Sequence, residues 1–222
     1  MTRKIVFSLV LNLVVIIVSA QVSNLPLKEW NSVADNPLIF YISGDGGYTS
    51  FSDSLCGTIN KAGYKVIALN SKSYFLDKKT PQQTTQDIVN CLNSQFGKRK
   101  NQQFVLVGYS FGADIAPFVA NALPDSIRKK MVSVVLLSPS TSTDFEIHVW
   151  DMLGGKKKRS MDVVAEVNKM GLQKTAILSG TDENDFPHNN IKLKNFTSEK
   201  LLGGHRYEGN TKEVAKTIMK FF

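Results

Sequence analysis

A serine between two glycines is the strongest chemical signal in this sequence. Gly108-Tyr109-Ser110-Phe111-Gly112 fits the pattern G-x-S-x-G, in which a sharp turn from a strand into a helix exposes a nucleophilic serine. The apolar run from Phe104 to Gly108 predicts a buried parallel strand before this turn. A helix after it would direct free N–H groups toward the serine, where an oxyanion would form. The pattern therefore predicts that Ser110 is a nucleophile.

A nucleophilic serine needs a base, and the sequence offers three histidines. His205 follows Leu201-Leu202-Gly203-Gly204 at the end of the last predicted strand, where α/β-hydrolase folds supply their base. His148 falls on another predicted strand, and we expect it to be a packing or surface residue. His188 lies in the loop that must supply the acid and is a second choice. The predicted base is therefore His205.

The acid should lie between the serine and the base in chain order. The predicted strand 176–179 leads into the loop 180–187, which contains Asp182, Glu183 and Asp185. The sequence pattern alone does not decide which of these three carboxylates is the acid of the triad. We expect the two that do not contact the base to be solvated loop charges.

The oxyanion site is predicted from backbone groups. The N–H of Phe111 and one N–H from the turn at Asp45 and Gly46 are the expected donors, because the glycines of that turn let the backbone approach a substrate carbonyl. A tight strand-to-helix connection is the alternative reading of those glycines. Asp114 lies one helical turn beyond Ser110, where it either complements the helix N-terminus or shapes the pocket.

Strands and helices alternate along the chain, which predicts an α/β fold: an α/β-hydrolase with a doubly wound, mostly parallel sheet of about six to seven strands in a single domain. A helix after the elbow is expected to be interrupted or kinked at Pro117. Residues 145–150 alternate apolar and polar side chains, which predicts an added, half-exposed strand. The other strands are predicted at 37–43, 65–70, 104–108, 132–137, 175–179 and 196–202, and the other helices at 50–62, from Thr80 to Phe96, 162–170 and 211–221.

The first 20 residues have the pattern of a signal peptide. Arg3 and Lys4 form a basic start, residues 5–18 are mostly apolar, and Val18-Ser19-Ala20 offers small residues for cleavage. The apolar run is short for a membrane span, and an uncleaved anchor is the alternative. We therefore expect an exported protein with a signal peptide at 1–20, a linker at 21–36 and a hydrolase domain at 37–222.

Charge and cysteine content bound the possible partners. The net charge of +8 favours anionic surfaces, but the sequence has no nucleic-acid-binding motif, so no nucleic acid partner is expected. Cys56 and Cys91 fall on the first two predicted helices, which should cover opposite faces of the sheet, and we expect free, buried thiols. No pattern indicates a cofactor or a metal.

Six segments, in order, resemble the VirJ/AcvB family of bacterial virulence proteins: SGDGGY, KTPQQTTQD, GYSFGADIAPFVANALP, FEIHVWDMLGG, GTDENDFP and LLGGHRYEGN. The resemblance covers nearly all of the chain after residue 20. It implies an α/β-hydrolase in the periplasm, with Ser110 as nucleophile, His205 as base and Asp185 as the acid.

The chain departs from the family pattern at three places. Tyr48 stands where the family usually has Trp, Arg206 replaces a second His, and Tyr207-Glu208-Gly209-Asn210 replaces F-D-G-D. These changes leave the expected triad intact and alter the acceptor side of the pocket.

The resemblance also implies a function. AcvB-like members hydrolyse lysyl-phosphatidylglycerol, and VirJ is linked to type IV secretion in plant-associated bacteria. A cationic lysyl group needs carboxylates nearby, for which Asp45, Asp114 and Glu208 are candidates. Residues 156–159 are basic and either rest on anionic lipid or form a solvated loop.

Two other functional classes remain open. One is a non-enzymatic periplasmic adaptor for secretion substrates, and the other is a general carboxylesterase or thioesterase. The expected partners are an aminoacyl phospholipid or another ester at the membrane surface, together with type IV secretion components. An intact triad favours an enzyme, whereas a filled pocket or a misaligned His205 favours the adaptor.

Overall fold

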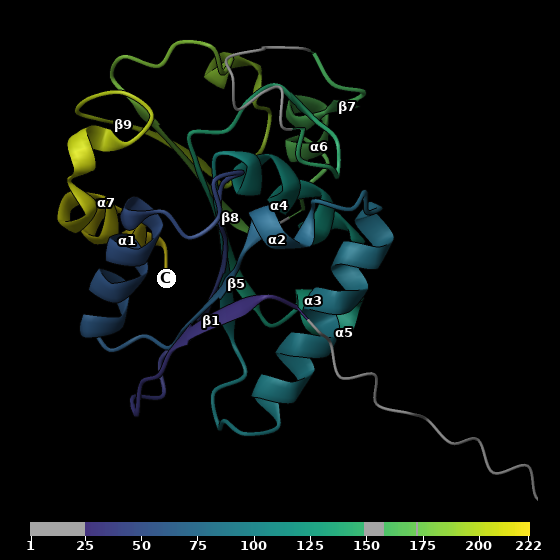
Figure 1. The fold of residues 1–222 in the computed structure, drawn as a ribbon, viewed down its shortest axis with the longest axis vertical. Coiled ribbons are helices and arrows are strands. Elements are labelled where there is room, and N and C mark those ends of the chain that lie inside the picture. The colour runs from purple at the N-terminus through teal and green to yellow at the C-terminus, as the bar shows by residue number, and fades with distance from the viewer. Residues whose placement is uncertain (1–24, 149–157, 172) are drawn as a thin grey trace, which may run out of the picture.

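A computed structural model describes residues 25–148, 158–171 and 173–222, and its centre is a seven-stranded sheet (Figure 1). The strand order is β1-β3-β2-β4-β5-β8-β9, in which β1 pairs antiparallel with β3 and the other neighbours are parallel. The predicted doubly wound, mostly parallel sheet is thus confirmed. The strands are β1 (Leu27–Trp30), β2 (Leu38–Ile42), β3 (Val66–Leu69), β4 (Phe104–Tyr109), β5 (Met131–Leu137), β8 (Lys174–Gly180) and β9 (Phe196–Leu201).

Helices cover both faces of the sheet (Figure 1). One face packs against α1 (Ser50–Lys61) and α7 (Thr211–Ile218). The other packs against α2 (Ser71–Tyr74), α3 (Pro81–Phe96), α4 (Phe111–Ala122), α5 (Asp125–Arg128) and α6 (Val163–Val167). Short 3₁₀ turns follow at His188–Asn190, Tyr207–Gly209 and Met219–Phe221.

Burial on both faces explains the continuous apolar runs of the central strands. In β2, Phe40 and Ile42 belong to the core on the α3–α4 side, whereas Ile39 and Tyr41 belong to the core under α1 and α7. All four side chains have no exposed surface. A strand buried on both faces cannot alternate apolar and polar residues, so its sequence reads as an unbroken apolar run.

Local signals place the helices between these strands. Thr80 and Gln83 form a reciprocal capping box at the start of α3, and Pro81 occupies the first helical position, where no N–H is required. Thr49 caps α1 by accepting a hydrogen bond from the N–H of Ser52.

Three expectations about the elements are corrected. The segment 21–36, expected to be a linker, contributes edge strand β1. The strand expected at 145–150 is absent over residues 145–148, and residues 149 and 150 lie outside the described residues. Two backbone hydrogen bonds instead hold this segment against the loop after α2, from Lys79 N–H to the carbonyl of Phe145 and from Ile147 N–H to that of Phe75. This packing buries Phe145 and Ile147 and leaves Glu146 and His148 partly exposed, which accounts for the alternating pattern. Helix α4 continues through Pro117 to Ala122.

A separate pair of short strands, β6 (Ser142–Thr143) and β7 (Met161–Asp162), lies outside the main sheet.

The two thiols are buried and free, as expected, with Cys56 in one core and Cys91 in the other. The proposed signal peptide and the basic residues 156 and 157 lie outside the described residues. Within the described part of the chain, no helix is long and apolar enough to cross a membrane.

Candidate active site

The turn between β4 and α4 has the geometry of a nucleophile elbow. Ser110 has φ of 53° and ψ of −122°, a conformation that L-residues rarely adopt. A Cβ on Gly108 would lie 2.3 Å from the carbonyl oxygen of Gly112, and a Cβ on Gly112 would lie 2.1 Å from that of Ile42. Both positions of the motif therefore need glycine, because the helix packs directly onto the ends of the strands.

Ser110 and His205 meet as the sequence predicted. The Nε2 atom of His205 lies 2.8 Å from the Oγ of Ser110, within hydrogen-bond distance. The Nδ1 atom of His205 lies 2.7 Å from Oε1 of Glu183. With Nδ1–H donating to this carboxylate, Nε2 is left to accept the serine proton, which is the arrangement of a Ser-His-acid triad.

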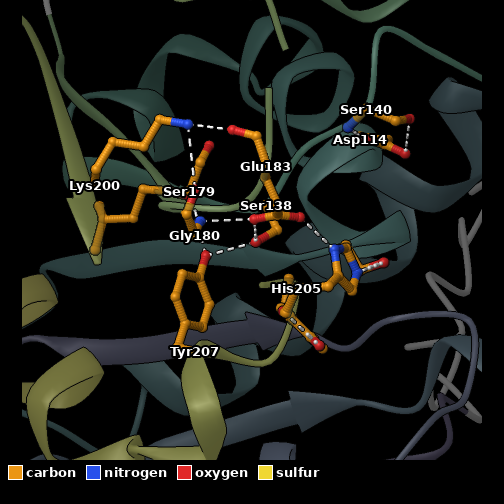
Figure 2. A network of polar contacts seen from close by, with 12 residues as sticks. Asp114, Ser138, Ser140, Ser179, Gly180, Glu183, Lys200, His205 and Tyr207 are labelled. Carbon is orange, nitrogen blue, oxygen red and sulfur yellow. Dashed lines mark hydrogen bonds and ion pairs between the residues drawn. The ribbon is translucent and has the colours of Figure 1, made fainter. Parts of the chain in front are cut away.

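Glu183 is held by three donors (Figure 2). Besides His205, the Oγ of Ser138 donates to Oε2 at 2.6 Å and the N–H of Gly180 donates to the same oxygen at 2.7 Å. Burial by itself would raise the pKa of this carboxyl, but hydrogen bonds from His205, Ser138 and Gly180 outweigh it and lower the pKa to about 2. The carboxylate is therefore ionised throughout the physiological pH range.

This arrangement corrects the expected acid. The family resemblance implies that Asp185 contacts His205, but in the structure Nδ1 of His205 contacts Glu183. Asp185 is exposed and lines the wall of the neighbouring cleft. Asp182 is exposed on the loop and accepts a hydrogen bond from Thr181 at 3.2 Å, as expected for a surface charge.

The other two histidines lie apart from Ser110. Both ring nitrogens of the partly buried His188 contact hydroxyl groups, Nε2 with Ser179 at 3.1 Å and Nδ1 with Ser198 at 2.8 Å, so both are already engaged. His148 contacts the carboxylate of Asp144 at 2.8 Å and lines the cleft. His148 is thus a partly exposed residue of the cleft wall, which is compatible with the expected packing or surface position.

Backbone strain gathers at this end of the sheet. Among the described residues, four that are not glycine have positive φ: Ser110, Ser138, Tyr207 and Glu208. They belong to the elbow, the end of β5 and the loop after His205. Such conformations persist only where the surroundings enforce them, and they are commonest at functional sites.

A cleft of about 680 Å³ opens beside Ser110. Carboxylates dominate its charged lining, which also includes two basic side chains and one imidazole. The charged and titratable lining residues are Asp45, Asp114, Asp144, Glu146, His148, Lys158, Arg159 and Asp185. The site is therefore open to a substrate and is able to bind positive charge.

Asp114 is buried in the first turn of α4 and lines the cleft. Its two carboxylate oxygens accept hydrogen bonds from Ser140, one from the N–H and one from the hydroxyl, both at 2.6 Å. Burial raises the pKa of Asp114 to about 7, although both hydrogen bonds oppose the shift. Asp114 thus fastens the loop after β5 to the helix that carries Ser110.

Of the residues predicted to bind the oxyanion or the headgroup, some line the cleft and others do not. Phe111 and Asp45 line the cleft. The turn lies against the nucleophile, since a Cβ on Gly44 would be 3.3 Å from Cβ of Ser110. The N–H of Gly46 donates to the Asp45 carboxylate at 2.8 Å, so it is already used.

Glu208 does not line the cleft; its side chain packs over Gly203, whose added Cβ would lie 2.6 Å from Cγ of Glu208. The expected role of Glu208 as a headgroup ligand is therefore corrected.

Sequence reasoning missed several residues of the site. Ser138 and Ser140 lie in a Ser/Thr/Pro loop at the carboxyl end of a predicted strand, and that position was a usable signal. Glu146 lies on the misassigned strand, and Tyr207 lies on a turn that the sequence patterns do not define.

Comparisons with known proteins identify the family and the fold of the chain. A sequence model of the family described as "Bacterial virulence protein (VirJ)" matches residues 35–222. No curated protein sequence matches the chain.

Several solved structures share the fold. Est1E from Butyrivibrio proteoclasticus is 16% identical, with a TM-score of 0.62 over 88% of this chain and 90% of that one. A predicted CIB-like hydrolase from Thermoplasma acidophilum is 16% identical, with a TM-score of 0.60 over 88% and 90%. The esterase domain of a Rhodothermus marinus protein is 12% identical, with a TM-score of 0.59 over 87% and 91%. At such low identity these likenesses show the α/β-hydrolase fold.

Proposed function

The chain belongs to the VirJ family of bacterial virulence proteins, and we propose that it is a serine ester hydrolase in which Ser110, His205 and Glu183 form the catalytic triad. The observation that carries the proposal is the continuous chain of contacts, 2.8 Å from Ser110 to His205 and 2.7 Å from His205 to Glu183, beside an open cleft. A filled pocket or a displaced imidazole would have favoured a non-enzymatic adaptor.

The proposed reaction has two steps. The Oγ of Ser110 attacks the ester carbonyl carbon while Nε2 of His205 takes the Oγ proton. The tetrahedral intermediate expels the alcohol, which receives that proton, and leaves an acyl group on Ser110. Water then attacks the acyl carbon as His205 takes its proton, and the acid is released as Ser110 regains a hydrogen. Glu183 stays ionised and stabilises the imidazolium.

Backbone donors would stabilise the oxyanion of each intermediate. The N–H of Phe111 begins α4, where the first N–H groups have no partner within the helix. Because the N–H of Gly46 is taken by the Asp45 side chain, we assign the second donor to the N–H of Asp45 itself.

The proposed substrate is lysyl-phosphatidylglycerol, at the periplasmic membrane surface. The family resemblance suggests it, and the charges of the cleft support it. Asp45 and Glu146 offer carboxylates for the lysyl ammonium groups, while Lys158 and Arg159 offer positive charge for a phosphate. Among the described residues Glu146 has no hydrogen bond or ion pair, so it is available to a ligand. A general carboxylesterase would not need this arrangement of charge.

The test uses vesicles that contain lysyl-phosphatidylglycerol and, in parallel, a p-nitrophenyl ester. We expect lysine release by the parent protein and loss of both activities in Ser110→Ala, with little change in thermal stability because the change is small. Unaltered turnover by Ser110→Ala would overturn the enzymatic proposal. Turnover of the p-nitrophenyl ester alone would retain the hydrolase and reject the lipid.

Headgroup recognition has a matched control. Glu146→Gln and Asp45→Asn should reduce activity on the lysyl lipid about 10- to 100-fold more than on alanyl-phosphatidylglycerol, because a charge-assisted hydrogen bond contributes about 1.5–3 kcal/mol. Glu208→Gln makes the same chemical change outside the cleft and should leave the ratio of the two activities unchanged. Equal losses on both lipids would mean that the lysyl group is bound elsewhere.

A further inference from the structure

Ser138 and Tyr207 lie on the side of Glu183 away from His205, and the hydrogen bonds of their hydroxyl groups go to Glu183, to each other and to Leu178 (Figure 2). Ser138 follows β5 directly, with φ of 49°. Its Oγ lies 2.6 Å from Oε2 of Glu183 and 2.7 Å from the hydroxyl oxygen of Tyr207. The tyrosine hydroxyl also lies 3.0 Å from the carbonyl oxygen of Leu178. These contacts form one connected series that ends on the acid.

The protons of the two hydroxyl groups decide how the series is arranged. Each hydroxyl donates one hydrogen. If Ser138 donates to Glu183, the single hydrogen of Tyr207 can go either to Ser138 or to the carbonyl oxygen of Leu178, and in both cases the carboxylate keeps its donor. The reverse direction, from Ser138 to Tyr207 and on to Leu178, would take a donor away from the acid. An ionised carboxylate favours the first arrangement, because hydrogen bonds to a charged acceptor are the stronger ones.

Burial makes the series rigid. Tyr207 is 1% exposed and Ser138 is 4% exposed, so water cannot replace either hydroxyl without opening the core. The ring of Tyr207 stacks on Phe51 of α1 with centroids 6.0 Å apart. Tyr207 also follows His205 by two residues and has positive φ, so the same anchor fixes the loop that carries the base.

We propose that Ser138 and Tyr207 are positioning residues of this hydrolase: Tyr207 orients the hydroxyl of Ser138, and Ser138 holds Glu183 in the orientation that directs His205 toward Ser110. The proposal rests on the hydrolase function proposed above. Without the Ser138 hydroxyl, Oε2 of Glu183 would keep only the N–H of Gly180, and the carboxylate could rotate away from the imidazole.

The test measures kcat and KM for a p-nitrophenyl ester. Ser138→Ala should lower kcat about 10-fold with little change in KM, because the hydroxyl acts on the triad and not on the substrate. Ser138→Gly removes the same hydroxyl and suits the positive φ, so it serves if the alanine variant fails to fold. Tyr207→Phe should lower kcat by a smaller factor.

Two variants provide controls elsewhere in the core. Ser133→Ala removes a buried hydroxyl of β5 that has no hydrogen-bond partner among the described residues, and Tyr41→Phe removes a buried phenol that contacts Ser52 on α1. Both should retain the parent kcat. The double variant Ser138→Ala/Tyr207→Phe should lose no more than Ser138→Ala alone, because the tyrosine acts through the serine.

The outcomes separate the two proposals. Parental kcat in both Ser138 variants, or losses that multiply in the double variant, would overturn the positioning role while the hydrolase proposal stands. If the parent protein shows no turnover, or if its turnover does not depend on Ser110, both the hydrolase proposal and the positioning role would be overturned. An equal loss of kcat in Ser133→Ala would show that the effect is a general response of β5.

Discussion

Two carboxylates, Glu183 and Asp114, lie near Ser110, and their environments shift their pKa values in opposite directions. Glu183 accepts three hydrogen bonds, one of them from His205, and its pKa falls to about 2. Asp114 is more deeply buried, accepts hydrogen bonds from Ser140 alone, and its pKa rises to about 7. The same loop after β5 supplies Ser138 to one acid and Ser140 to the other (Figure 2).

The difference shows what assigns a role to an acid in this site. Burial raises the pKa of both groups. Asp114 is more deeply buried and has fewer donors, so burial prevails there, whereas the hydrogen bonds and the charge of His205 prevail at Glu183. An acid that must stabilise an imidazolium has to stay ionised, and Glu183 meets this requirement. Asp114 fastens the loop to α4 and would be half-protonated near neutral pH.

The largest expected effect is a difference in kcat between variants of the two acids. Glu183→Gln should reduce kcat for a p-nitrophenyl ester by about 10³- to 10⁴-fold, because the amide cannot hold the imidazole in the required tautomer and charge state. Asp114→Asn keeps an oxygen that accepts from Ser140 and should change kcat less than about 10-fold. A larger loss in Asp114→Asn would reverse the roles given to the two acids.

The pH dependence of stability provides the second test. Because the folded-state pKa of Asp114 is raised, its contribution to stability is complete below about pH 4 and is lost as pH rises through about 7, a change of up to about 4 kcal/mol. The contribution of Glu183 is present above about pH 4.5 and is lost as pH falls through about 2. Urea unfolding should therefore show Asp114→Asn gaining stability over the parent from about pH 4 to 8.

The control for this test is Glu183→Gln, which should be less stable than the parent by a constant amount above about pH 4.5 and should approach the parent as pH falls toward about 2. Parallel stability curves of the parent and Asp114→Asn across the neutral range would mean that Asp114 does not titrate there.

The smallest expected effect comes from Ser140→Ala, which removes one of the two donors to Asp114 and leaves the backbone N–H. We expect a loss of about 1.5–3 kcal/mol at pH values where Asp114 is ionised, and a smaller loss where it is neutral. Ser133→Ala, with no partner to lose among the described residues, should show no such pH dependence. A pH-independent loss in Ser140→Ala would indicate a packing effect only.

Much of the fold was predictable, because burial on both faces leaves unbroken apolar runs such as that of β4. The contact between Ser110 and His205 was also predictable, since the elbow needs glycines at fixed spacing and the proposed base follows the last strand. Edge strand β1 was missed because it is only partly buried and carries no such run. Residues 145–148 alternate because they pack on the segment after α2, and an alternating pattern does not identify the partner of a backbone.

The acid was not decidable from sequence because three carboxylates lie within four residues of the loop. The backbone turns at Gly180, whose carbonyl accepts the N–H of Glu183 at 3.1 Å, and this turn brings the glutamate side chain back toward the N–H of Gly180. Gly180 itself packs on the loop before His205, where a Cβ would lie 2.2 Å from the carbonyl oxygen of Gly203. Such contacts between two loops have no signature in the spacing of residues.

The most direct test of the proposed triad is the rate at which a fluorophosphonate labels Ser110, followed by intact mass and peptide mapping. We expect labelling of the parent at Ser110 alone, none in Ser110→Ala, a rate reduced by orders of magnitude in Glu183→Gln, and a near-parental rate in Asp185→Asn. Labelling that persists in Ser110→Ala, or a loss in Asp185→Asn with a parental rate in Glu183→Gln, would contradict the triad of Ser110, His205 and Glu183.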